Sequence, residues 1–240
     1  MKKIAVKQPW DQIKREFDPS TVGVLLTSHP RQQMFWDKGL SCWNDSPFFV
    51  LLGYDDVDDS KIKDHVAEYN GVKQIFCTGQ RSGHVGGELL QFQMGSKILS
   101  DMRFRYFLKL AADYEINPEE IWRLHEALER VTFSEVLKPP RLVETGSQML
   151  QIGTVLVFGF TDIIYAMMKP MKMGHPYGAA ERYFTRQRLN LNISRASYPH
   201  ELGPKKGLEH DLGIHHVQGQ YAYDEGITVL DTWERGEIWK

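Results

Sequence analysis

Two carboxylates stand close together where an apolar stretch of the sequence becomes polar. Asp113 and Glu115 follow the mostly apolar residues 106–112, and Pro118 comes shortly after them. In an extended segment, residues two apart point to the same side, so both carboxylates could face one cation. Magnesium or manganese is commonly held by one or two carboxylates together with substrate phosphates. The alternative is structural, because acidic residues ahead of a helix also stabilise its N-terminus.

Other polar residues stand where apolar runs end, and they are candidates for contacting a ligand. In chain order they are Thr27, Ser28 and His29 after one run, then Asp55 and Asp56 after the next. A carboxylate in such a place can accept hydrogen bonds from a base or a ribose. It can equally belong to a solvated turn, and the sequence leaves both possibilities open.

A glycine cluster at Gly83, Gly86 and Gly87 precedes an apolar helical segment. Its spacing matches neither the dinucleotide fingerprint nor the phosphate-binding P-loop. The glycines could form a tight turn with close helix packing. They could also let the backbone approach a ligand at a helix N-terminus.

These residues need a scaffold, and the hydrophobic pattern predicts an α/β fold. Apolar strand-like runs alternate with helical periodicity, which indicates a mostly parallel central sheet with helices on both faces. The expected strands are 21–29, 47–59, 72–78, 103–113 and 154–160, and the expected helices are 30–43, 61–71, 79–101, 117–131, 161–171 and 178–190. Ligands of such sheets bind at the carboxyl ends of the strands. The polar candidates follow these ends.

Composition narrows the function classes. The formal net charge of -2 argues against a protein that binds a nucleic-acid backbone. Only two cysteines are present and no CxxC spacing occurs, so a cysteine zinc site or a disulfide scaffold is not expected. The N-terminus lacks the apolar run of a signal peptide, and glycines and Asp162 interrupt the apolar stretch 150–168. We therefore expect a soluble cytoplasmic protein without a transmembrane segment.

The order of these pieces resembles that of GT-A type nucleotide-sugar glycosyltransferases. The resemblance is carried by residues 22–43, 47–56, 86–99 and 106–115. It covers the order of elements over 20–135 and weakens afterwards. Asp113-Tyr114-Glu115 stands where that family has its DxD motif, as a DxE variant.

The resemblance implies one GT-A domain over 1–240, with a Rossmann-like nucleotide-sugar-binding half at 20–116 and an acceptor-binding half with a C-terminal loop at 117–240. It implies a UDP- or GDP-sugar donor, a glycan or other hydroxyl acceptor, and Mn²⁺ or Mg²⁺ on Asp113 and Glu115, with His215 as a late metal contact. The residues implied to contact the donor are Thr27, Ser28, His29, Asp55, Asp56, Gly86, Gly87, Lys109 and Asp113. An inverting enzyme also needs a carboxylate base in the second half, for which Glu181 is the first choice and Asp162 the second. The polar segment 198–220 is expected to order over bound donor.

Two other functions remain open on the sequence. The DxE departure favours a module of the same fold that binds a nucleotide or a glycan without turnover. A sugar nucleotidyltransferase would usually carry a glycine-rich and basic signature directly after the first strand. Residues 27–33 contain one arginine and no glycine, so we rank that function lower.

Overall fold

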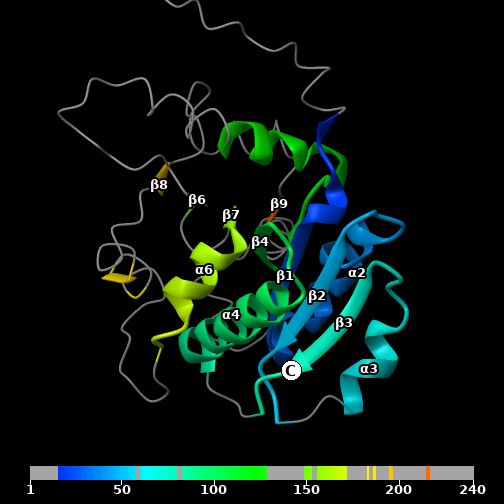
Figure 1. Cartoon of the computed structure of the whole chain (residues 1–240). Helices are drawn as coiled ribbons and strands as arrows, with labels where there is room; N and C mark the ends of the chain where they lie inside the picture. Colours follow the sequence, from blue (N-terminus) through cyan, green and yellow to red (C-terminus); the bar gives the residue numbers. More distant parts are fainter. Residues whose placement is uncertain are drawn as a thin grey trace, which may run out of the picture.

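The computed structural model describes residues 16–57, 60–79, 83–128, 149–152 and 156–171, with short pieces at 183, 186–187, 195–196 and 215–216. A seven-stranded sheet with the order β3-β2-β1-β4-β7-β6-β8 forms the centre of the molecule (Figure 1). Its strands are β1 (Val22–Ser28), β2 (Phe49–Tyr54), β3 (Val72–Cys77), β4 (Tyr106–Ala111), β6 (Met149–Ile152), β7 (Leu156–Phe160) and β8 (Arg195–Ala196). Strands β3, β2, β1 and β4 are mutually parallel, whereas β7 is antiparallel to both of its neighbours. The predicted α/β fold with a mostly parallel sheet is confirmed.

Helices cover both faces of the sheet, and most begin or end where the sequence indicates. They are η1 (Pro19–Thr21), η2 (Pro30–Phe35), α2 (Trp36–Gly39), η3 (Ser41–Trp43), α3 (Ser60–Val66), α4 (Gly83–Asp101), η4 (Pro118–Glu120), a helix over 122–128 and α6 (Thr161–Met168). Asn117 caps η4, its side chain accepting a hydrogen bond from the Glu119 amide at 3.1 Å. Among these elements, no helix is long and apolar enough to cross a membrane.

The helix predicted over 30–43 is instead three short pieces, η2, α2 and η3. Its interruption has a steric reason at Gly39, the last residue of α2. A Cβ built on Gly39 would lie 1.8 Å from the carbonyl oxygen of Ala112. The chain therefore needs a glycine here to pass the end of β4, and glycine is a weak helix former.

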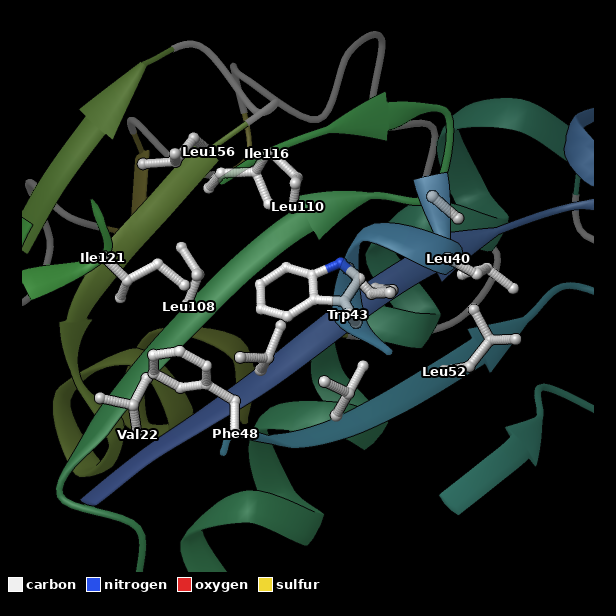
Figure 2. Packing of buried hydrophobic residues seen from close by; sticks show 14 of the residues in the cluster. Val22, Leu40, Trp43, Phe48, Leu52, Leu108, Leu110, Ile116, Ile121 and Leu156 are labelled. Carbon is white, nitrogen blue, oxygen red and sulfur yellow. The ribbon is translucent and has the colours of Figure 1, made fainter. Parts of the chain in front are cut away.

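Alternate residues of each strand face two separate cores. On β4, Leu108 and Leu110 belong to a core that also contains residues of α2, α3 and the helix at 122–128. Figure 2 shows Trp43 and Phe48 packed among strand residues of this first core. Phe107 belongs to the second core, which lies under α4 and α6. This period of two is the expected geometry of a strand that is buried on both faces.

Strand order reverses at β1. The chain builds β1, β2 and β3 outward in one direction and then returns, so that β4 pairs with the other side of β1. In open α/β sheets, ligands bind in the crevice at the carboxyl ends of the strands where the order reverses. The reversal marks the ends of β1 and β4 as the place to look for a site.

An amide on α4 fixes the C-terminal end of α6. The side-chain nitrogen of Gln93 lies 3.2 Å from the carbonyl oxygen of Met168, 3.3 Å from that of Lys169 and 3.1 Å from that of Met171. The last carbonyls of a helix have no partner within the helix. The Met168 carbonyl already accepts a hydrogen bond from the Met171 amide at 3.0 Å, and Gln93 adds a side-chain donor to this group of carbonyls.

Strand β3 lies at one edge of the sheet. Lys73 and Gln74, in its middle, are exposed, and the Lys73 ammonium donates to the carbonyl oxygen of Asn70 at 2.8 Å. The edge strand therefore carries polar side chains where the inner strands carry apolar ones.

We predict that Gly39→Ala destabilises the protein by about 3 kcal/mol, because the added methyl group meets the backbone of Ala112 and neither segment can yield freely. Lys38→Ala, at the exposed neighbouring position, is the matched control and should change stability by less than about 0.5 kcal/mol. Urea unfolding followed by circular dichroism measures both. Equal stabilities of the two variants would contradict the close approach.

Candidate functional site

The carboxyl ends of β1, β2 and β4 are joined by backbone hydrogen bonds that continue beyond the strands. The Asp55 amide donates to the Ser28 carbonyl at 3.1 Å, and the Ala112 amide donates to the Thr27 carbonyl at 2.9 Å. The residues that follow these strands therefore lie side by side. We call this edge of the sheet, from Asp55 across Ser28 to Asp113, the carboxyl edge.

The polar residues at the end of β1 are largely used by the fold. Ser28 is 1 % exposed, and its hydroxyl accepts a hydrogen bond from the indole nitrogen of Trp36 at 2.9 Å. Its backbone amide donates to the side-chain oxygen of Gln91 at 2.8 Å. Thr27 is also buried, whereas His29 is half-buried. Of the three, His29 is the one with surface available to a ligand.

Asp55 is a buried carboxylate that joins three elements. One of its oxygens accepts a hydrogen bond from the Thr78 hydroxyl at 3.0 Å, just after β3. A Cβ on Gly87 of α4 would lie 2.3 Å from its other oxygen, so the helix backbone packs directly on the carboxylate. Asp56 is half-buried, and its side chain accepts from the Val57 amide at 2.6 Å. Asp56 is the more accessible of the two acids.

The two glycines predicted to contact the donor differ in surroundings. Gly87 is buried against Asp55, so its missing side chain serves helix packing. Gly86 is exposed. A ligand at the N-terminal turn of α4 can thus approach the backbone at Gly86 and not at Gly87.

Lys109 lies inside the sheet and forms an ion pair with α4. Its side chain is 1 % exposed, and its ammonium lies 2.5 Å from a carboxylate oxygen of Glu88, whose side chain is 20 % exposed. Taking an ammonium out of water costs several kcal/mol unless a hydrogen-bonded opposite charge compensates. The structure therefore gives Lys109 a carboxylate partner within the protein, and places no part of it at the surface for a phosphate.

Asp113, Tyr114 and Glu115 follow β4 at the reversal point, but residues 112–113 form a turn, so the prediction that Asp113 and Glu115 lie in one extended segment is wrong. Asp113 is 4 % exposed, and the other two are half-buried. Burial, followed by the negative charges of Asp113 and Glu88, raises the pKa of Tyr114 to about 12. The tyrosine therefore stays protonated at neutral pH.

Burial also raises the pKa of the Cys42 thiol to about 11, with a smaller contribution from the charge of Glu115. That thiol is not a thiolate nucleophile.

A second, two-stranded sheet brings a distant part of the chain to the acid pair. Strands β5 (Tyr114–Glu115) and β9 (His215–His216) are antiparallel, with Glu115 opposite His215. The sequence separates these two residues by a hundred positions, yet the backbone register pairs them. Among the side chains that the structure describes, no three acidic, histidine or cysteine groups form a cluster that could hold a metal ion.

Asp162 lies near the start of β4, at the opposite end of the parallel strands from the carboxyl edge. Because β7 is antiparallel to β4, its end meets the start of β4, with Phe160 opposite Tyr106. The Asp162 carboxylate accepts a hydrogen bond from Ser100, near the end of α4, at 3.0 Å. At a helical rise of 1.5 Å per residue, Ser100 is about 20 Å along α4 from Gly87. Asp162 is therefore not placed to act at the carboxyl edge. Glu181 lies outside the described residues, as does the segment 198–220 apart from β9.

Glu88, Gln91 and Thr78 belong to this edge and were not among the predicted residues. A signal for Glu88 exists in the sequence: Lys109 stands inside an apolar strand, and a buried ammonium requires a nearby carboxylate. Gln91 and Thr78 carry no comparable signal, because a polar side chain at a helix or strand end is usually solvated.

We predict that Gly87→Ala destabilises the ligand-free protein by about 1 to 3 kcal/mol, because the methyl group would overlap the buried carboxylate of Asp55. Gly86→Ala is the matched control. Its exposed position accepts a methyl group, and alanine favours helix by up to about 1 kcal/mol over glycine. Thermal unfolding should therefore move in opposite directions for the two variants. A stability gain in Gly87→Ala would show that the helix does not rest on Asp55.

Solved structures with a distantly similar fold include the following two, whereas no protein-family model and no curated protein matches the sequence. A cytidylyltransferase from Leptospira borgpetersenii serovar Hardjo-bovis (strain JB197) is 10% identical over 76% of this chain and 77% of that chain, with a TM-score of 0.42. A protein from Desulfovibrio desulfuricans G20, named as belonging to the nucleotide-diphospho-sugar transferases, is 9% identical over 86% and 96% of the two chains, with a TM-score of 0.47. Both similarities are distant, so neither neighbour's activity passes to this chain.

Proposed function

We propose that this protein is a glycosyltransferase that moves a sugar from a UDP- or GDP-sugar donor to a hydroxyl of a glycan or other acceptor. The observation that carries the proposal is the position of Asp113 and Glu115, directly after β4 at the point where strand order reverses. An open α/β sheet binds its ligand at that point. Carboxylates there suit a donor whose phosphates come with a divalent cation.

The carboxylates at this edge are of the residue type that Mn²⁺ or Mg²⁺ would take as ligands. Both ions prefer oxygen ligands and are bound by one or two carboxylates, with the remaining positions taken by phosphates and water. Asp113 and Glu115 would hold the ion, and His215 is the proposed third ligand because the backbone register places it opposite Glu115. The bound ion would neutralise negative charge on the departing nucleoside diphosphate.

The chain's own residues would orient the donor around that point. Asp56 and His29, the more accessible groups after β2 and β1, are the proposed contacts for the nucleoside. The first turn of α4 would offer its free backbone amides to the phosphates, and the exposed Gly86, which has no side chain, would leave room for them. Tyr114 keeps its proton at neutral pH and could donate a hydrogen bond to a phosphate or sugar oxygen. Each of these contacts approaches the carboxyl edge from a different element.

We predict that Asp113→Asn weakens binding of UDP or GDP in the presence of Mn²⁺ by about 10-fold or more, because it removes a charged oxygen ligand. Binding of the bare nucleoside should change by less than about 2-fold. Titration calorimetry with both ligands measures the difference. Asp162→Asn is the control, since Asp162 lies at the opposite end of the parallel strands.

Equal losses for diphosphate and nucleoside in Asp113→Asn would count against a cation site. They would favour a structural role ahead of η4, where Asn117 already caps the helix. No nucleotide binding by the unaltered chain, with or without Mn²⁺, would reject the proposed function itself.

We further propose Glu181 as the base that takes the proton of the acceptor hydroxyl. Acids that hold the cation are not available for this step, and Asp162 is at the wrong end of the strands, which leaves Glu181 of the two predicted candidates. Glu181→Gln keeps the shape and removes the base, so turnover should fall by about 100-fold or more while donor binding is retained. Release of nucleoside diphosphate from a UDP- or GDP-sugar with acceptor measures turnover. Full turnover in Glu181→Gln would exclude this base, and binding without turnover in the unaltered chain would favour a binding module.

A further inference from the structure

The first turns of α4 contact the ends of three neighbouring strands. Gly87 packs on Asp55 after β2, and Gln91 accepts the amide hydrogen bond of Ser28 at the end of β1. Glu88 forms the ion pair with Lys109 of β4. Position 91 is four residues from 87 and three from 88, so Gln91 is a neighbour of both on the helix surface. One helical face therefore spans the reversal point from β2 to β4.

The third of these contacts differs from the others in its energetics. The contact at Gly87 is steric and the hydrogen bond at Gln91 is neutral, so the energy of each depends mainly on the atoms that touch. The Lys109 ammonium, in contrast, is almost fully buried, and Glu88 is its ion-pair partner on α4. An ammonium left without a carboxylate at such a depth is strongly destabilising. The ion pair with Lys109 therefore fixes the position of Glu88, and of the helical turn that carries Gly86, relative to β4.

Glu88 lies near the strand end that carries Asp113, because its partner Lys109 is two residues from the end of β4 and four residues before Asp113. The Glu88 side chain is 20 % exposed, whereas that of Lys109 is 1 % exposed, so the pair runs from the interior toward the surface. Glu88 is therefore the link between a charge inside the sheet and the residues proposed to meet the donor diphosphate.

We propose that Glu88 is a positioning residue for the donor diphosphate, and that Lys109 is buried in order to hold it. The ion pair fixes the N-terminal turn of α4 relative to Asp113, so that the exposed backbone at Gly86 and the carboxylate of Asp113 face the same diphosphate from two sides. This role rests on the proposed function of the site. It reassigns Lys109 from a phosphate contact to the residue that anchors Glu88.

The test separates position from stability by removing the pair in two ways. Glu88→Gln removes the carboxylate beside the buried Lys109 ammonium, and Lys109→Met removes the cation beside the part-buried Glu88 carboxylate, so each should lower the unfolding midpoint by about 10 °C. The double variant contains neither charge and should recover most of that loss. Lys97→Met with Asp101→Asn is the matched control, because this exposed ion pair is on the same helix at its far end.

The deciding measurement is affinity for UDP or GDP with Mn²⁺, compared with affinity for the bare nucleoside. We expect the double variant to bind the diphosphate about 10-fold more weakly and the nucleoside unchanged, as is usual when a residue behind a metal or phosphate site is lost. The control pair should change neither. A double variant that recovers its stability and binds diphosphate like the unaltered chain would overturn the proposal, because the pair would then serve stability alone.

Two further measurements keep the outcome decisive. Glu88→Asp retains the charge and draws the carboxylate back by one methylene, so unaltered diphosphate affinity in this variant would also overturn the proposal if the double variant does not fold. If the unaltered chain binds no nucleotide, the proposed function fails by that result. The positioning of α4 is then judged by hydrogen exchange at residues 84–91, which must be faster in the double variant than in the control, and equal rates would reject it.

Discussion

The handedness of the connections between parallel strands determines where everything else in this protein lies. Such connections are right-handed in nearly all proteins, because a right-twisted strand followed by a helix packs back onto the sheet in that way. Moving outward from β1 to β3 places α2 and α3 on one face, and returning to β4 places α4 on the other (Figure 1). The helices thereby separate at β1. The ends of β1 and β4 are left between them, and this is where the chain has its acid pair.

The strands that form this edge could be predicted from the sequence because each is a short, nearly continuous apolar run. The alternation with helices then implied parallel neighbours, and so a common edge for Asp55 and Asp113. The direction of β7 could not be predicted in the same way. An apolar run such as 156–160 has the same pattern whether it pairs parallel or antiparallel with its neighbour. Because β7 is antiparallel to β4, Asp162 lies at the opposite end of the strands from Asp113.

Contacts across long sequence distances were likewise beyond pattern analysis. Nothing in the local sequence pairs Glu115 with His215, since the β5 and β9 segments are two residues long and gain their pairing from the tertiary structure. The helix expected over 30–43 failed for a related reason. Its periodicity is genuine, with Trp36 and Trp43 both fully buried, but the backbone of Ala112 occupies the space that a side chain at position 39 would need. Here a close contact between two backbone segments overrides the local tendency of the sequence to form a helix.

The exposed polar edge at β3 has a consequence for self-association. An edge strand presents unpaired backbone groups that can recruit the edge of another molecule and start aggregation. Here the middle of the strand carries Lys73, whose ammonium is held beside the strand by the carbonyl of Asn70. Two molecules meeting through β3 would bring two positive charges together within a region that is also exposed at Gln74. The exposed Lys73, which lies outside the core, thus disfavours pairing between the β3 strands of two molecules.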